Sequence, residues 1–335
     1  MRIFLVFTLA MLLTSCSMTS INPLKINGVS FVASRDSIND SHIKPIMNIH
    51  ANYAALMPFG FIKDLAHPEV RYNSSRQWFG ETKVGVKQYV EALESKGVKI
   101  MIKPQIWVSR GLFTGFIKMN NDAEWLQLEA TYSNFILEYA RLAEDVHADI
   151  FCIGTELETF IDDRPDYWKA LIKDIRKLYS GKLTYAANWN EYDRTPFWDQ
   201  LDYIGIDAYF PVSDQKTPSV EVCKSGLIKY KEAVAKCSKT LKKPVLFTEF
   251  GYRSVDFSGK QPWRSDRSMT AVNLEAQKNT TQALFETFWN EDWFAGGFLW
   301  KWHHKHEKSG GENNSRFTPQ NKPVEALIKA MYANY

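Results

Sequence analysis

Short apolar runs alternate with segments of helical periodicity along almost the whole chain, and no other feature constrains its fold as strongly. The runs that we interpret as strands cover residues 26–33, 51–57, 98–102, 149–154, 183–187, 202–206, 245–249 and 294–300. The helices predicted between them cover 41–50, 83–96, 121–147, 164–179, 195–200, 220–241, 269–289 and 323–332. Strands separated by helices are typical of a parallel sheet, and eight such pairs predict an α/β fold, a (β/α)8 TIM barrel.

The chain length agrees with this prediction. Its 335 residues suffice for one large barrel or for two ordinary domains. A doubly wound open sheet is the alternative, but no glycine-rich phosphate turn follows the first strand. We therefore expect residues 26–335 to form a single TIM-barrel domain, with a long loop at 60–80 after the second strand.

Two of the predicted strands each deliver a glutamate at the carboxyl end. The run at 150–153 leads through Gly154 and Thr155 to Glu156, and the run at 245–247 leads to Glu249. The active site of a TIM barrel lies at this end of the strands. A carboxylate there is costly to desolvate unless it has partners or a chemical role. Two such carboxylates are what a hydrolase needs when one group protonates a leaving oxygen and the other attacks or activates water.

Each glutamate also has a plainer interpretation. Glu249 would serve only structure if it formed an ion pair with Arg253, because ion-pair networks also place charges at such positions. Glu158 has the same strand parity as Glu156 and is the alternative acid if the strand boundary is displaced.

The amino terminus has the pattern of a targeting segment. Arg2 precedes an apolar stretch, residues 3–13, that is too short for a typical membrane span. The stretch runs through small residues into Cys16, which resembles a bacterial lipobox. The resemblance implies cleavage before Cys16 and lipid attachment to its sulfur, so residues 1–15 would be a signal peptide and 16–25 a linker. An ordinary secretory signal cleaved slightly later is the alternative.

The charge and the composition limit the classes of molecule that the chain is expected to bind. The formal net charge is +3 and no basic run is present, so nothing predicts a nucleic-acid partner. The 11 tryptophans suit a sugar-binding cleft, because aromatic faces cover the apolar face of a pyranose. We expect membrane contact only through the lipid anchor, a location in the bacterial cell envelope, and a monomer.

The cysteines and histidines predict neither a disulfide framework nor a metal site. Beyond Cys16 the chain has three cysteines, of which Cys223 and Cys237 either pair or share one helix. The histidines at 303, 304 and 306 lie in a polar loop and are expected to be solvated. We therefore expect an enzyme without a metal or another cofactor.

Glutamates that end strands four and seven resemble those of the clan A retaining glycoside hydrolases. Within this clan the chain resembles glycoside hydrolase family 113, whose characterised members are β-mannanases. The similar stretches are I-G-T-E-L-E around Glu156, D-Y-I-G-I-D-A-Y-F at 202–210, T-E-F-G-Y-R-S at 248–254 and G-G-F-L-W-K-W at 296–302. The resemblance implies that Glu156 is the acid/base and Glu249 the nucleophile.

Further site residues follow from the same resemblance. Tyr209 would hydrogen-bond the nucleophile, and Trp300 would be the aromatic platform under the sugar. Thr155 occupies a position where many clan members have an asparagine that holds the sugar 2-hydroxyl, and Asn188 or Asn190 would share that contact.

Plainer roles remain open for the aromatic residues. Trp107 is a further candidate to line the cleft, with core packing as its alternative. For Tyr209 and Trp300 the alternative role is packing at the top of the barrel, since aromatic residues commonly fill such positions.

Together these observations predict a lipid-anchored, metal-independent retaining endo-β-1,4-mannanase that acts on polysaccharides or oligosaccharides. One alternative is the same mechanism acting on another β-linked glycan. Another is a catalytically inactive glycan-binding surface lipoprotein, against which the two glutamates argue.

Overall fold

Eight parallel strands close into a barrel in the computed structural model, which describes residues 24–265 and 269–335. In chain order they are β1 (Ile26–Phe31), β2 (Tyr53–Leu56), β4 (Lys99–Ile102), β6 (Ile150–Thr155), β7 (Lys182–Asn188), β8 (Ile204–Asp207), β9 (Val245–Phe250) and β10 (Phe294–Trp302). β1 pairs with both β2 and β10, which closes the sheet. The predicted single-domain (β/α)8 TIM barrel is confirmed.

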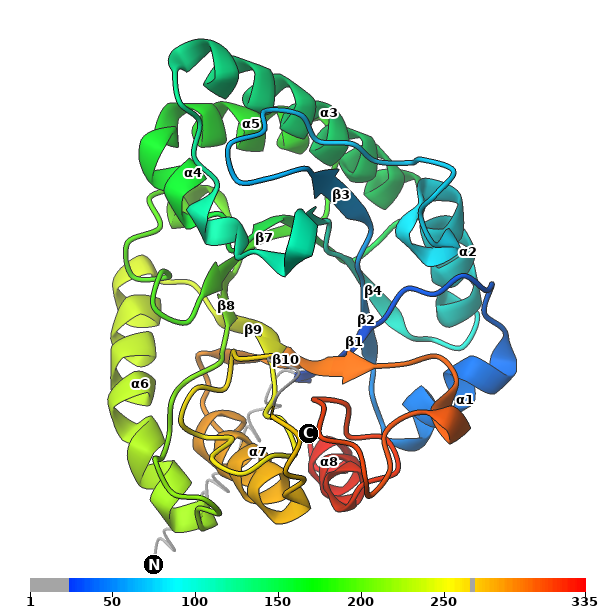
Figure 1. Cartoon of the computed structure of the whole chain (residues 1–335), viewed down its shortest axis with the longest axis vertical. Helices are drawn as coiled ribbons and strands as arrows, with labels where there is room; N and C mark the ends of the chain where they lie inside the picture. The colour runs from blue at the N-terminus through cyan, green and yellow to red at the C-terminus, as the bar shows by residue number, and fades with distance from the viewer. Residues whose placement is uncertain (1–23, 266–268) are drawn as a thin grey trace, which may run out of the picture.

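A ring of helices surrounds these strands (Figure 1). The helices are α1 (Asp40–Asn48), α2 (Lys83–Glu94), α3 (Asp122–Asp145), α4 (Glu158–Asp163), α5 (Pro165–Leu178), α6 (Val220–Leu241), α7 (Leu274–Phe288) and α8 (Pro323–Ala333). Single 3-10 turns lie at Phe79–Glu81, Ser109–Gly111, Thr114–Phe116, Trp198–Gln200 and His306–Lys308. The helix predicted at 195–200 is therefore only a 3-10 turn.

Polar caps decide where two of the long helices begin. The side chain of Asn121 accepts a hydrogen bond from the backbone of Glu124, so α3 begins where the sequence predicted. The start predicted for α7 at residue 269 is wrong. Asn273 accepts a hydrogen bond from the backbone N–H of Ala276 at 2.9 Å, and this cap starts the helix at Leu274.

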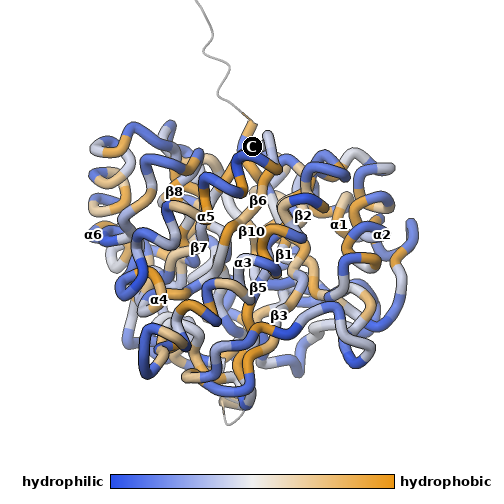
Figure 2. Tube along the Cα trace, turned by 90° about the horizontal axis from the view of Figure 1, so that it is seen from above, coloured by the Kyte–Doolittle hydropathy of each residue, from blue (hydrophilic) through white to orange (hydrophobic). Residues whose placement is uncertain are grey.

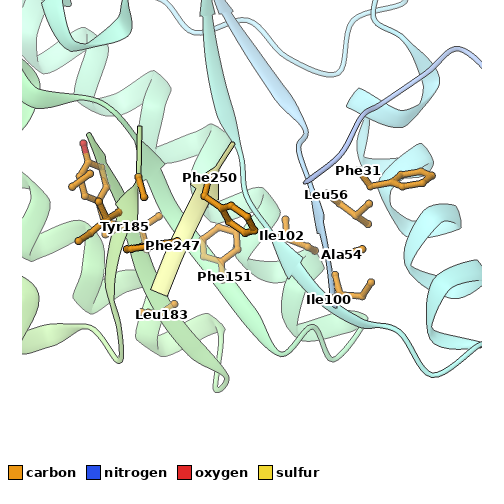
Figure 3. Packing of buried hydrophobic residues seen from close by; sticks show 14 of the residues in the cluster. Phe31, Ala54, Leu56, Ile100, Ile102, Phe151, Leu183, Tyr185, Phe247 and Phe250 are labelled. Carbon is orange, nitrogen blue, oxygen red and sulfur yellow. The ribbon is translucent and has the colours of Figure 1, made fainter. Parts of the chain in front are cut away.

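Alternate residues of the barrel strands enter two different cores. Ala54, Leu56, Ile100 and Ile102 belong to the cluster between strands and helices, which Figure 3 shows from close by. Their neighbours belong to a second cluster that fills the barrel: Ile26, Ala55, Met101, Ile150, Cys152, Ala186, Leu246 and Phe298. Because both faces of the strands are largely buried, apolar residues predominate in them, and the tube has orange segments near the labels of β6 and β10 (Figure 2).

A small second sheet was missed by the sequence analysis. β3 (Phe59–Ile62) and β5 (Gln105–Val108) pair in parallel, the first largely within the predicted loop and the second in a segment for which no element was predicted. Pro58 and Pro104 each end a barrel strand, as predicted, but both chains then resume side by side, with Gln105 N–H donating to Pro58 C=O at 2.9 Å. The prediction that residues 60–80 are entirely loop is therefore wrong at its start. The extra sheet carries Trp107 over the end of the barrel.

The cysteines and histidines only partly follow the predictions. Cys152, Cys223 and Cys237 are free, and the last two lie on α6, about 21 Å apart along its axis. The solvated state predicted for the histidine loop is wrong. His303, His304 and His306 are all partly buried, and His306 lies 2.6 Å from the Glu325 carboxylate.

The structure does not test the predicted signal peptide or the predicted lipid anchor at the amino terminus. No helix within residues 24–265 and 269–335 is long and apolar enough to cross a membrane. The predicted signal peptide at 1–15, Cys16 and most of the predicted linker lie outside the described residues.

Candidate active site

A cleft of about 960 Å³ lies over the carboxyl ends of the barrel strands. Both glutamates singled out from the sequence line it, together with five of the predicted contact residues: Trp107, Asn188, Asn190, Tyr209 and Trp300. Glu156 directly follows β6, the fourth barrel strand, and Glu249 lies near the end of β9, the seventh. The barrel therefore brings together residues from positions 107 to 300 of the chain.

The carboxylate of Glu249 is buried and fully occupied by donors. Lys103 and Gln105 both donate to Oε1, the latter at 2.9 Å. The Tyr209 hydroxyl donates to Oε2 at 2.6 Å. Such bonds favour the ionised form and fix its orientation. The structural pair with Arg253 is not what holds it, because Arg253 donates to the backbone carbonyls of Ser315 and Met269.

Glu156 has a contrasting environment. Its carboxyl group has no hydrogen-bond donor among the described residues, although its backbone N–H donates to Ala186 C=O at 2.8 Å. Burial raises the pKa of Glu156 well above that of an ordinary carboxyl group, and the charges of Asp207 and Glu249 raise it further. Its φ of 50° lies in the left-handed region, which is costly for a residue with a side chain and is found most often at functional sites.

A buried lysine connects Glu249 to a third carboxylate. Lys103 is fully buried and lies 3.5 Å from Asp207, whose Oδ1 also accepts the Thr248 hydroxyl at 2.7 Å. Burial alone would lower the pKa of Lys103, but the charges of Asp207 and Glu249 outweigh it and raise that pKa. Burial, followed by the charge of Glu249, raises the pKa of Asp207 to about 7. Asp207 and Glu249 thus share the buried cation of Lys103.

The loop after β7 supports the chain around Glu156. The Tyr185 hydroxyl accepts the backbone N–H of Leu157 at 2.6 Å and donates to Glu191 at 2.8 Å. The other oxygen of Glu191 accepts the backbone N–H of Asn188 at 2.9 Å. Burial raises the pKa of Glu191 to about 7. One buried carboxyl group therefore links the segment of the candidate acid to the asparagine that lines the cleft.

The structure shows where two further residues from the sequence analysis lie, Glu158 and Thr155. Glu158 begins α4 and forms an ion pair with Arg194, and it is not among the residues that line the cleft. Thr155 is also absent from the cleft lining, and its hydroxyl is buried without a hydrogen-bond partner among the described residues. Contact between Thr155 and a sugar stays a prediction, whereas Asn188 is already exposed to the cleft.

Aromatic side chains surround the two glutamates. Trp107, for which core packing was the alternative, is 49% exposed on β5. The rings of Trp189 and Trp263 stack with centroids 5.2 Å apart and an interplanar angle of 20°. Both line the cleft and were missed by the sequence analysis, because they lie in loops whose partners are distant in the chain. These rings give the cleft several apolar faces on which pyranose rings can stack.

No group of three or more histidine, cysteine, aspartate or glutamate side chains within the described ranges is arranged to hold a metal ion. Metal independence stays a prediction, which an assay with a chelator tests.

The comparison with models of protein families shows to which family the chain belongs. The model for Glycoside Hydrolase Family 113 matches residues 33–322, which is most of the chain and includes both glutamates. The chain belongs to glycoside hydrolase family 113. It is therefore a clan A glycoside hydrolase, and its substrate is a carbohydrate. The family resemblance noted from the sequence is confirmed.

Solved structures of this family have the same fold. A GH113 β-mannanase from Alicyclobacillus acidocaldarius is 22% identical, with a TM-score of 0.78 over 92% of this chain and 97% of that one. Two structures titled as GH113 β-1,4-mannanase are 23% and 24% identical, with TM-scores of 0.80 and 0.79. They cover 93% and 92% of this chain, and it covers 99% of each. No curated protein sequence matches the chain.

The buried lysine of this family 113 chain gives a first prediction. Lys103→Met leaves Asp207 beside Glu249 without the cation that separates their charges, so ionisation of Glu249 becomes harder. We expect the acidic limb of the pH profile of kcat/KM to move upward by about one unit or more. We also expect the free energy of unfolding to fall by roughly 3–5 kcal/mol, because a buried charge loses its partner.

Lys99→Met is the matched control for this variant. Lys99 is the first residue of β4, the strand that Lys103 directly follows, but it is exposed and lies 3.6 Å from Asp149. Exposed ion pairs contribute little, so neither the profile nor the stability should change appreciably. An unshifted acidic limb in a folded Lys103→Met variant would show that Lys103 does not control Glu249.

Proposed function

We propose that this chain is a retaining β-glycosidase in which Glu249 is the nucleophile and Glu156 the general acid and base. The observation that carries this proposal is the contrast between the two carboxyl groups in one cleft. Glu249 receives three donors that favour its ionised form, whereas Glu156 receives none and has a raised pKa. Two carboxyl groups in such different environments are suited to acid and nucleophile roles at one bond.

In this mechanism Glu156 donates its proton to the glycosidic oxygen while Glu249 attacks the anomeric carbon. The bond to the leaving sugar breaks, and an ester forms between the sugar and Glu249. Glu156, now ionised, then takes a proton from water. The water oxygen attacks the anomeric carbon, and the ester bond to Glu249 breaks. Tyr209 is positioned to release Oε2 of Glu249 as that oxygen becomes part of the ester.

For the substrate we propose an endo-acting β-1,4-mannanase that works on mannan-type polysaccharides or oligosaccharides. Support comes from the similarity in fold to solved mannanases and from an open cleft with several aromatic faces. The same mechanism on another β-linked glycan is the second candidate. It is favoured by the low identity to those structures, 22–24%.

A substrate panel tests this proposal. The purified protein is incubated with mannan, glucomannan, xylan, galactan and cellulose oligosaccharides, and the products are identified. Release of short β-1,4-linked manno-oligosaccharides from mannan is expected. Cleavage of another member with mannan left intact would exclude the mannanase proposal and leave the retaining mechanism standing.

We also propose that the protein is a monomer anchored by a lipid on Cys16 in the bacterial cell envelope. The apolar stretch that runs into Leu13-Thr14-Ser15-Cys16 supports this location. Cys16→Ala should release the protein from membranes or leave an uncleaved precursor, as measured by fractionation and mass. Ser17→Ala is the control and should leave the anchor in place. Mature Cys16→Ala protein that stays in the membrane fraction would contradict the proposal.

A further inference from the structure

Two cationic side chains that line the cleft have no carboxylate partner in the part of the chain that the structure describes. Lys301 follows Trp300 on β10, and Arg316 lies in the loop before α8. Neither side chain forms a hydrogen bond or an ion pair within residues 24–265 and 269–335. The Lys301 ammonium lies 5.0 Å from the centre of the Trp300 ring, so it is next to the expected sugar platform. Both cations are thus available to a ligand in the cleft.

The charges of the two glutamates do not account for these cations. Both oxygens of Glu249 already have donors, among them the ammonium of Lys103. Glu156, with its raised pKa, keeps its proton to higher pH than an ordinary carboxyl group and carries no charge while protonated. The cleft wall near Trp300 therefore has two cations that form no ion pair with a carboxylate within the described residues.

Burial makes the charge of Lys301 costly. Burial lowers the pKa of Lys301; the charge of Glu249 opposes this effect, and the charge of Arg316 adds to it. A neutral sugar would leave the buried ammonium of Lys301 with no negative charge nearby beyond that of Glu249. An anionic group between them would satisfy both, because charge-assisted hydrogen bonds to carboxylates and sulfates are the strong ones.

We propose that the cleft beside Trp300 binds a sugar residue that carries an anionic group, a carboxylate or a sulfate ester, between Lys301 and Arg316. This inference rests on the proposed β-glycosidase function and defines its substrate more closely. Within the mannan-type substrates proposed above, the preferred substrate is then an acidic one, in which the anionic sugar lies next to the bond that is cleaved.

Binding measurements separate this inference from catalysis. Calorimetry compares the β-1,4-linked trisaccharides of mannose, of mannuronic acid and of 6-O-sulfated mannose. The chain carries Glu156→Gln, which prevents turnover while keeping the neutral charge of the protonated acid. We expect one of the two acidic trisaccharides to bind about 10- to 100-fold more tightly than the neutral one. Which one does so distinguishes a carboxylate from a sulfate ester.

Charge-removing variants locate the effect. Added to the same background, Lys301→Gln and Arg316→Gln should each abolish most of the preference for the acidic sugar. Lys308→Gln removes a charge from the neighbouring loop outside the cleft and should keep the preference. Circular dichroism checks that each variant is folded, and the exposed Arg316 provides a test even if Lys301→Gln does not fold.

Several outcomes would overturn the inference. These are equal affinity for neutral and acidic trisaccharides, a preference that survives both substitutions, or inorganic sulfate that binds as tightly as the sulfated sugar. Initial rates of hydrolysis by the unaltered chain, measured with neutral and acidic substrates, distinguish this inference from the proposed glycosidase mechanism. Cleavage of the neutral substrate without any acidic preference would refute only the inference. Tight acidic binding without hydrolysis of any β-linked glycan would refute only the glycosidase mechanism.

Discussion

Glu249→Ala is expected to lower kcat/KM on the order of 10⁵-fold, because removal of a covalent nucleophile eliminates the reaction path rather than weakening one contact. This loss corresponds to about 7 kcal/mol of transition-state stabilisation. Alanine also leaves a space lined by Lys103, Gln105 and Tyr209. Added azide or formate should occupy that space and restore cleavage with inverted stereochemistry, as followed by proton NMR of the product.

Glu158→Ala is the control for this experiment. It removes a carboxylate that pairs with Arg194 outside the cleft, so hydrolysis should stay near the unaltered rate. A Glu249→Ala variant that keeps normal hydrolysis would refute the assignment of this cleft.

Glu156→Ala should give a different pattern because its role depends on the leaving group. Loss of a general acid lowers the rate by roughly 10²–10⁴-fold with natural glycosides. An activated aryl glycoside needs no proton on its leaving group, so formation of the ester at Glu249 should be nearly unimpaired. Azide should then restore turnover with retained stereochemistry, since it attacks the ester that has already formed.

The same residue controls one limb of the pH profile. The pKa of Glu156 is raised, so its proton persists above the range of an ordinary carboxyl group and is lost as the pH rises further. Activity with natural glycosides should fall along this alkaline limb, and Glu156→Ala should flatten it. If Glu158→Ala gave these effects while Glu156→Ala stayed active, the acid would be Glu158 and the assignment wrong by one side-chain repeat.

The barrel and the two glutamates could be predicted because their signals are local. Each strand is a short apolar run, and Glu156 and Glu249 directly end two of them. Lys103 and Asp207 stand in the same kind of position, at the ends of β4 and β8, and a charge there was a signal that the sequence analysis did not use. That they share one buried network with Glu249 follows only from closure of the barrel.

Other features depend on contacts that the sequence does not record. β3 and β5 follow prolines that end barrel strands, and they form because both chains leave the barrel side by side. The stack of Trp189 on Trp263 joins loops that are far apart in the chain, and Lys301 on β10 and Arg316 in a later loop line the same cleft. Residue type alone could not predict such pairs, because loop conformation decides which side chains reach the cleft.

Trapping of the covalent intermediate tests the central claim most directly. The purified protein is incubated with a β-mannoside that carries a fluorine at carbon 2 and an activated leaving group, which slows hydrolysis of the ester more than its formation. Peptide mass spectrometry should then find one added fluorosugar on Glu249. A label on a different carboxylate, such as Asp207, Glu158 or Glu191, would contradict the account, as would a first product of inverted configuration.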